Sequence, residues 1–264
     1  SQQADQKRMR RYAKGPDRGP LRIVRPRRHW PAFTPPRWPG IRPPLTRPRA
    51  AEVEPGSASA SGQTERTLAM LPAQYRWLEA EPGPRMIAEA LKEYGTLEAP
   101  GAADNPKIIG WQAELEVAGL GRAYAGVYRH DAIPWCGLFM AIVAHRANIE
   151  RRPERNPPRL YLSALEWASF GVSVPKGAAA LGDVLVFKRK GGGHVGLYVG
   201  QDSPNKNSAS AFHVLGGNQQ NRVSITRLSR NRLVAVRRPA YRAQPANVRP
   251  IPLAASGSLS VNEA

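Results

Sequence analysis

The chain has 264 residues, with 39 Lys and Arg against 20 Asp and Glu, so its formal net charge is +19. Its length suffices for a packed core, which excludes a chain that depends on staples to fold. The single cysteine, Cys136, excludes an intrachain disulfide and a cysteine-based zinc site.

Apolar segments of the sequence are short. The longest, GLFMAIVA at 137–144, falls well below the 18 residues that a membrane-spanning helix needs, so we expect no membrane span. The first 20 residues are basic but lack the apolar stretch of a secretory signal. We therefore expect no signal peptide.

Residues 1–50 form a basic, proline-rich segment with 14 Lys and Arg against Asp5 and Asp17, a net charge of +12. Its prolines favour an extended arm over a helix or an inner strand. One interpretation is a solvated, disordered arm. The other is a docking arm, in which Trp30, Phe33, Trp38 and the arginines lie on a protein partner or along nucleic acid.

Residues 51–69 are small and polar, which predicts a flexible linker, and the folded domain is expected over 70–241. Four helices are predicted from apolar spacing, Pro near helix starts and Gly near helix ends. Their ranges are 84–95, 105–121 (with Asn105 as the cap), 136–148 and 160–171.

After residue 180 the pattern changes to short alternating or β-branched runs separated by turn residues. These runs are GDVLVFKRK, HVGLYVGQ, AFHVLGGN, VSITRLS and LVAVRRP. Helices followed by strands predict an α+β fold, with a small antiparallel sheet packed on helices. We expect residues 242–264 to be an unstructured tail.

Cys136 lies two residues after Pro134, at the start of the third predicted helix. It could be a small buried core residue. It could equally be a nucleophile, because unpaired N–H groups at a helix start favour a thiolate. His145 lies about 13 Å further along this helix, at 1.5 Å per residue, and cannot be its base.

His194 is the best candidate base, since it follows three glycines and begins an alternating strand. A third group must orient the imidazole, and the next strand offers Asn218 or His213. We prefer Asn218, which follows two glycines that permit close approach. An exposed turn histidine and a turn asparagine are the alternatives for His194 and Asn218.

The order of these motifs, with Cys136 at a helix start, then GGGHVGLYVG, then HVLGGNQ, resembles the CHAP and NlpC-type cysteine amidases and peptidases of the papain-like superfamily. IPWCGLFM, GHVGLYVG and LGGNQ are similar to phage and prophage cell-wall hydrolases. The resemblance covers about residues 84–240. It implies a nucleophile helix packed on a small antiparallel sheet.

The resemblance further implies hydrolysis of a peptidoglycan amide bond, by a muramoyl-alanine amidase or a peptide endopeptidase. Cys136 would be the nucleophile, His194 the base and Asn218 the orienting residue, with no metal or other cofactor. Asp131 and Trp135 match positions that support the site in the family. Tyr128 or His130 would supply a second oxyanion donor besides the Cys136 N–H.

Bacterial peptidoglycan is the expected substrate, and virion or tail proteins are the expected partners of residues 1–50. Nucleic acid is a minor alternative, because the excess charge is concentrated in the arm. The expected location is a virion or the host cytoplasm, with action in the periplasm or cell wall. The alternative function is a structural virion or assembly protein, whose papain-like module binds and whose basic arm anchors it.

Overall fold

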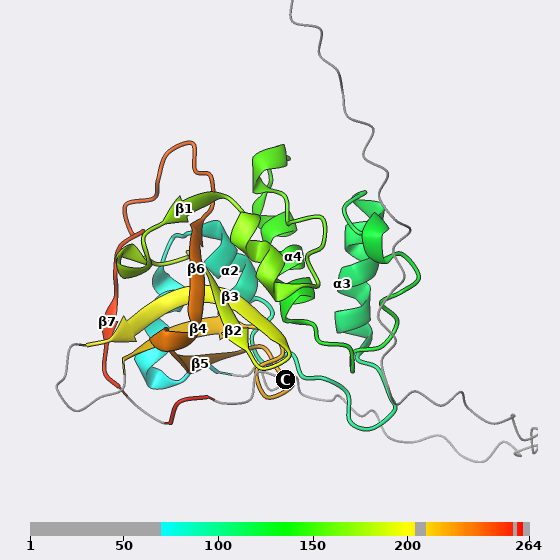
Figure 1. Cartoon of the computed structure of the whole chain (residues 1–264), viewed down its shortest axis with the longest axis horizontal. Helices are drawn as coiled ribbons and strands as arrows, with labels where there is room; N and C mark the ends of the chain where they lie inside the picture. Colours follow the sequence, from blue (N-terminus) through cyan, green and yellow to red (C-terminus); the bar gives the residue numbers. More distant parts are fainter. Residues whose placement is uncertain (1–69, 204–209, 256–257, 261–264) are drawn as a thin grey trace, which may run out of the picture. The chain divides into compact units, whose positions relative to one another are not determined.

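The computed structural model describes residues 70–203, 210–255 and 258–260. The predicted arm at 1–50 and the predicted linker at 51–69 lie outside these residues. Within them, helices come first and strands follow (Figure 1). The α-helices are α2 (Arg85–Leu91), α3 (Pro106–Val117) and α4 (Cys136–Ala147). The 3-10 helices are η1 (Ala73–Ala80), η2 (Arg122–Tyr124), η3 (Pro153–Arg155), η4 (Ala164–Ser169), η5 (Lys176–Ala178) and η6 (Arg230–Arg232).

The strands of the described residues join in one seven-stranded sheet, in which β1, β6, β2, β3, β4 and β5 are neighbours in that order. All these neighbours pair antiparallel, and β7 adds to β3 in parallel. The predicted α+β class with an antiparallel sheet is therefore confirmed. The strands are β1 (Val172–Val174), β2 (Val184–Arg189), β3 (Gly192–Asp202), β4 (Ala211–Gly216), β5 (Ser224–Ser229), β6 (Leu233–Arg238) and β7 (Pro252–Leu253).

Local sequence signals account for the starts of α3 and α4. The Asn105 side chain caps α3 by accepting a hydrogen bond from the Lys107 N–H at 2.8 Å, and Pro106 fills the first helical position. Helix α4 begins at Cys136, two residues after Pro134, as the sequence predicts.

Residues 160–171 do not form the predicted α-helix; only the short 3-10 helix η4 forms there. The carbonyl of Tyr161 accepts a hydrogen bond from the Trp167 indole at 3.0 Å, so this oxygen is used by a side chain rather than by a helical N–H. The same carbonyl abuts the backbone of Gly137 in α4. Long-range packing thus fixes a conformation that the local apolar spacing does not predict.

The prediction of an unstructured tail is wrong for residues 248–253. Val248 and Ile251 are buried, and β7 extends the sheet beside β3. The Ile251 N–H donates to the Tyr198 hydroxyl at 3.1 Å, and the Ile251 carbonyl accepts from the Gln201 N–H at 2.9 Å. The folded unit therefore extends beyond the predicted boundary at residue 241.

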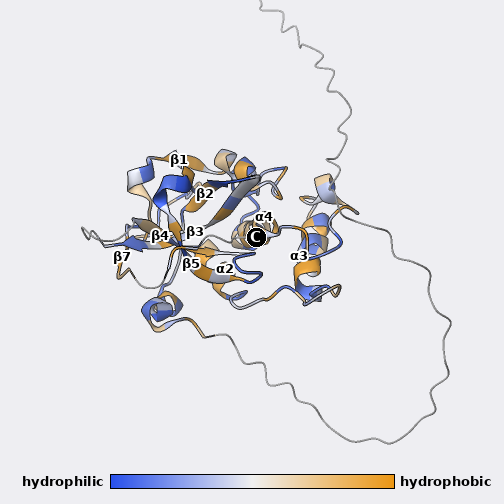
Figure 2. Ribbon diagram, turned by 60° about the horizontal axis from the view of Figure 1, so that its bottom comes forward, coloured by the Kyte–Doolittle hydropathy of each residue, from blue (hydrophilic) through white to orange (hydrophobic). Residues whose placement is uncertain are grey.

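Helix α4 is the central helix of the core, since every residue from Cys136 to His145 is buried. It packs on β3, α2 and α3, and Figure 2 shows hydrophobic segments on the sheet and on the helices around it. At its far end, Arg146 binds Glu114 of α3 and Glu93, both at 2.7 Å. Packing along its length and these ion pairs hold the N-terminal end of α4 in a fixed place.

We predict that Gly137→Ala destabilises the fold by about 1–3 kcal/mol, because a Cβ there meets the Tyr161 carbonyl and the backbone of Leu162. Gly110→Ala is the matched control: its Cβ in α3 meets no atom within 4 Å, and alanine favours a helix by up to about 1 kcal/mol. Denaturant unfolding of both variants measures the difference. Equal stability of the two would contradict this packing of the start of α4.

Candidate active site

Cys136 is the first residue of α4, and Trp135 is the N-cap without a side-chain hydrogen bond to the helix. The N–H groups of Cys136 and Gly137 both interact with the Cys136 sulfur. The helix start therefore presents its free donors to the sulfur, as the sequence predicts.

Burial raises the pKa of the Cys136 thiol above its ordinary value, since only 2% of the residue is exposed. A hydrogen bond from the Val195 N–H, the positive charge of Arg189 and the two helix N–H groups act in the opposite direction. Their sum is smaller than the effect of burial. The expected lowering of the pKa by the helix start is thus present but outweighed, and this conformation favours a protonated thiol.

His194 lies in β3 opposite Phe187 of β2 and is fully buried, so it is not the exposed turn residue that the sequence left open. The nitrogen of Val195, which contacts the Cys136 sulfur, is covalently bonded to the carbonyl carbon of His194. The structure therefore brings the backbone of His194 next to the nucleophile candidate.

Gly216, the last residue of β4, and Gly217 allow this close packing. The Nε2 atom of His194 lies 3.3 Å from the position that a Cβ of Gly216 would occupy. A Cβ of Gly217 would lie 2.5 Å from Phe139 and 2.7 Å from the ring of Trp135. The segment 216–217 thus contacts both the histidine and the start of α4, and Gly217 has no room for a side chain.

Asn218 follows these glycines with φ +56°, and it is buried. It lies two residues after Gly216, whose Cβ position would be 3.3 Å from the Nε2 atom of His194. Its Oδ1 atom is buried and has no hydrogen-bond partner within the described part of the chain. A buried amide oxygen of this kind can accept a hydrogen bond from a neighbouring N–H, which a plain turn residue would not need.

Asp131 and Trp135 hold the loop that precedes the nucleophile helix. The Oδ2 atom of Asp131 accepts from the N–H groups of Ala99 and Asn105, at 2.9 and 2.8 Å. The Trp135 indole donates to Glu98 at 3.1 Å. Both residues position the backbone around Cys136.

Glu98 is a site residue that sequence reasoning missed. Burial raises its pKa, although the hydrogen bond from Trp135 opposes this shift. Its N–H donates to the Asn221 carbonyl at 2.8 Å, so Glu98 joins the loop before α4 to the loop after Asn218. No local motif marks such a contact across more than 100 residues.

The two candidate oxyanion donors differ in their surroundings. Tyr128 is buried and its hydroxyl donates to the Ile133 carbonyl at 3.4 Å. Burial raises the pKa of Tyr128, and the nearby negative charges of Asp131 and Glu98 raise it further. His130 is exposed and its Nδ1 lies 3.0 Å from Asp104, so it does not face the sulfur as a buried donor would.

His213 does not belong to this site, which corrects its role as the alternative orienting residue. It pairs with Gly200, six residues along β3 from His194, or about 20 Å at 3.3 Å per residue. Its ring nitrogens lie 2.6 Å from the Tyr75 hydroxyl and 3.1 Å from Asp202. Arg227 completes this second cluster by binding Asp202 at 2.7 Å.

The His213 cluster predicts a loss of stability in acid. Burial lowers the pKa of His213 below its ordinary 6.5, despite the opposing effect of Asp202. Burial alone would raise the pKa of Asp202, but Arg227 and His213 hold it below its ordinary 3.8. At both residues the unfolded chain binds protons more readily, so the free energy of unfolding falls as the pH falls below 6.5, and further below 3.8.

Urea unfolding of the wild type and of His213→Gln between pH 5 and pH 8 tests this. His145, whose pKa is also lowered by burial, contributes in the same direction in both proteins. We expect the wild type to lose up to about 1.4 kcal/mol more per pH unit below 6.5 than the variant. If the free energy of unfolding depended on pH equally in both proteins, the loss of stability in acid could not be assigned to His213.

The described residues thus define an α+β protein with a cysteine at a helix start beside a buried histidine on the sheet. No protein-family model, no curated protein and no solved structure matches this chain.

Over the described ranges, no group of three His, Cys, Asp or Glu residues could hold a metal ion. No helix there is both long and apolar enough to cross a membrane.

Proposed function

We propose that the chain is a papain-like cysteine hydrolase that cleaves an amide bond of bacterial peptidoglycan. The observation that carries this proposal is the sulfur of Cys136, which lies at the start of α4 and contacts the backbone N–H that follows His194. A buried cysteine with only a packing role would not need donors from both a helix start and a neighbouring strand.

The proposed reaction begins with the neutral thiol, because burial raises the pKa of Cys136. His194 removes the thiol proton while the sulfur attacks the amide carbonyl carbon. The C–N bond then breaks, and the leaving amine takes the proton from His194. Water adds to the resulting thioester with help from His194, which releases a carboxylate and restores the thiol.

The remaining residues position these groups. Asn218, through its buried Oδ1, would accept a hydrogen bond from the imidazole of His194 and fix its tautomer. The Cys136 N–H would stabilise the oxyanion, with the Tyr128 hydroxyl as the second donor after a small rotation away from Ile133. Asp131 and Trp135 keep the backbone around the Cys136 N–H in place.

Residues 1–50 are proposed to attach the enzyme to virion or tail proteins, which would deliver it to the cell wall. This part of the proposal rests on the sequence alone. The alternative role, a structural virion protein, rests on the same residues. A module that only binds would not need a thiol and an imidazole close together, or glycines that let the chain pack tightly beside them.

Turbidity of purified peptidoglycan suspensions, incubated with the full chain, tests the proposal. We expect clearing that a thiol alkylating reagent prevents and that a metal chelator does not. A suspension that stays turbid with the untreated chain would contradict the proposed function. The chemical ends released would then distinguish an amidase from an endopeptidase.

A further inference from the structure

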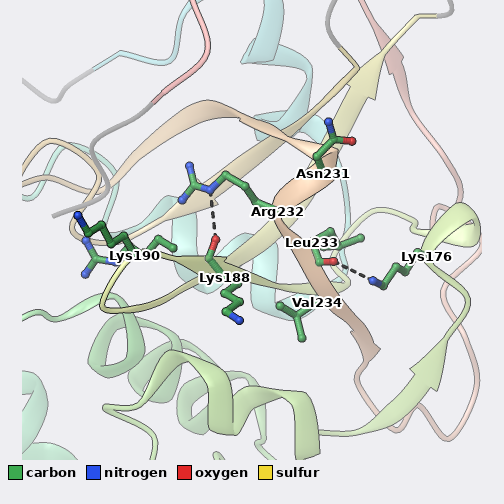
Figure 3. A pocket seen from close by; sticks show the side chains of 8 residues that line it. Lys176, Lys188, Lys190, Asn231, Arg232, Leu233 and Val234 are labelled. Carbon is green, nitrogen blue, oxygen red and sulfur yellow. Dashed lines mark hydrogen bonds between the residues drawn. The ribbon is translucent and has the colours of Figure 1, made fainter.

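A strongly basic depression lies at the end of β2 and the start of β6 (Figure 3). It is open and has a volume of about 850 Å³. In the described part of the chain, no carboxylate lines it. Its lining consists of Lys176, Lys188, Arg189, Lys190, Asn231, Arg232, Leu233 and Val234.

Backbone carbonyls contact two of these cations. Lys176 donates to the Leu233 carbonyl at 2.8 Å, and the Nε atom of Arg232 donates to the Lys188 carbonyl at 3.3 Å (Figure 3). The neutral carbonyl that holds Lys176 does not cancel the charge of its ammonium group. Several fixed positive charges in one hollow attract an anionic ligand.

The depression is continuous with the strand that carries His194. Lys188 and Arg189 pair with Gly193 and Gly192, the two residues before His194. The Nε atom of Arg189 donates to the Gly193 carbonyl at 3.2 Å. These backbone contacts place the basic depression next to the part of β3 that leads into His194.

We propose that this depression binds free carboxylates of the peptide stem of the substrate, next to the amide bond that Cys136 attacks. The inference rests on the proposed function, because the stem is the anionic part of peptidoglycan that continues directly from a cleavable amide. Lys188 and Lys190 are exposed and would make charge-assisted hydrogen bonds to these carboxylates. The site then selects substrates by the charge of the stem.

Binding is tested without turnover, in the full chain carrying Cys136→Ala. The probes are a purified disaccharide-tetrapeptide with free carboxylates and the same compound with its carboxylates amidated. We expect the free form to bind about fivefold more tightly, and Lys188→Gln with Lys190→Gln to reduce this preference to about one. Lys92→Gln with Lys107→Gln removes the same charge elsewhere and should retain the preference.

The inference would be overturned if the preference for the free carboxylates persists in the Lys188/Lys190 variant. It would also be overturned if the protein that keeps both lysines shows no such preference. So would a single-stranded oligonucleotide that displaces the muropeptide at lower concentration and loses this ability in the same variant. The proposed function fails separately, if wild-type protein leaves peptidoglycan uncut while the charge preference in binding is present.

Discussion

Cys136→Ser is expected to reduce peptidoglycan hydrolysis by at least about a thousandfold while the fold stays intact. The sulfur is held by the N–H groups of Cys136, Gly137 and Val195, and a serine oxygen fits the same place. A hydroxyl is a far weaker nucleophile than a thiol when the base is a histidine, so chemistry is lost and packing is kept. Initial rates of amine release from purified peptidoglycan measure the loss.

Thermal unfolding provides the control for this variant. Cys136→Ser should unfold within a few degrees of the wild type, because the side chain changes little in size. A folded variant that retains most of its activity would show that Cys136 is a core residue and not the nucleophile.

His194→Gln is expected to lower kcat/KM by about 10²–10⁴, the usual contribution of a positioned acid–base group. Glutamine can fill much of the space beside Gly216 but cannot carry the proton from the thiol to the leaving amine. The remaining activity should rise with pH as hydroxide removes the thiol proton, whereas the wild-type rate should level off. A pH series of kcat/KM for both proteins checks this.

His213→Gln is the matched control, since it removes the other fully buried histidine of the sheet. It breaks contacts to Tyr75 and Asp202 and should lower stability, while the rate per folded molecule stays near that of the wild type. The reverse pattern, with His213→Gln inactive and His194→Gln active, would show that His213 and not His194 is the base.

Local sequence patterns predicted the elements that carry the candidate site. The short runs after residue 180 form β2, β3, β4, β5 and β6, because β-branched and aromatic residues fit the pleated surface of a sheet. The central strands β2, β3 and β4 are buried on both faces over most of their length. The cap at Asn105 and the start of α4 after Pro134 follow from backbone chemistry at helix ends. The same signals point to Cys136, His194 and Asn218, whose catalytic roles are predictions.

Other features depend on contacts between distant residues and leave no local signal. The apolar spacing of 160–171 gives only η4, since the Tyr161 carbonyl packs on Gly137 and binds the Trp167 indole. β7 forms because Ile251 reaches Tyr198 and Gln201 across the sheet. The raised pKa of Cys136 likewise reflects burial by the whole core, which outweighs the helix start.

The central claim is that Cys136 attacks an amide carbonyl of peptidoglycan. Mass spectrometry of purified peptidoglycan, digested with the full-length wild type and with Cys136→Ala, tests it most directly. We predict muropeptides with a new amine and a new carboxylate at one amide bond in the wild-type digest, and none in the variant digest. The same products from both proteins, or none from the wild type, would contradict the claim.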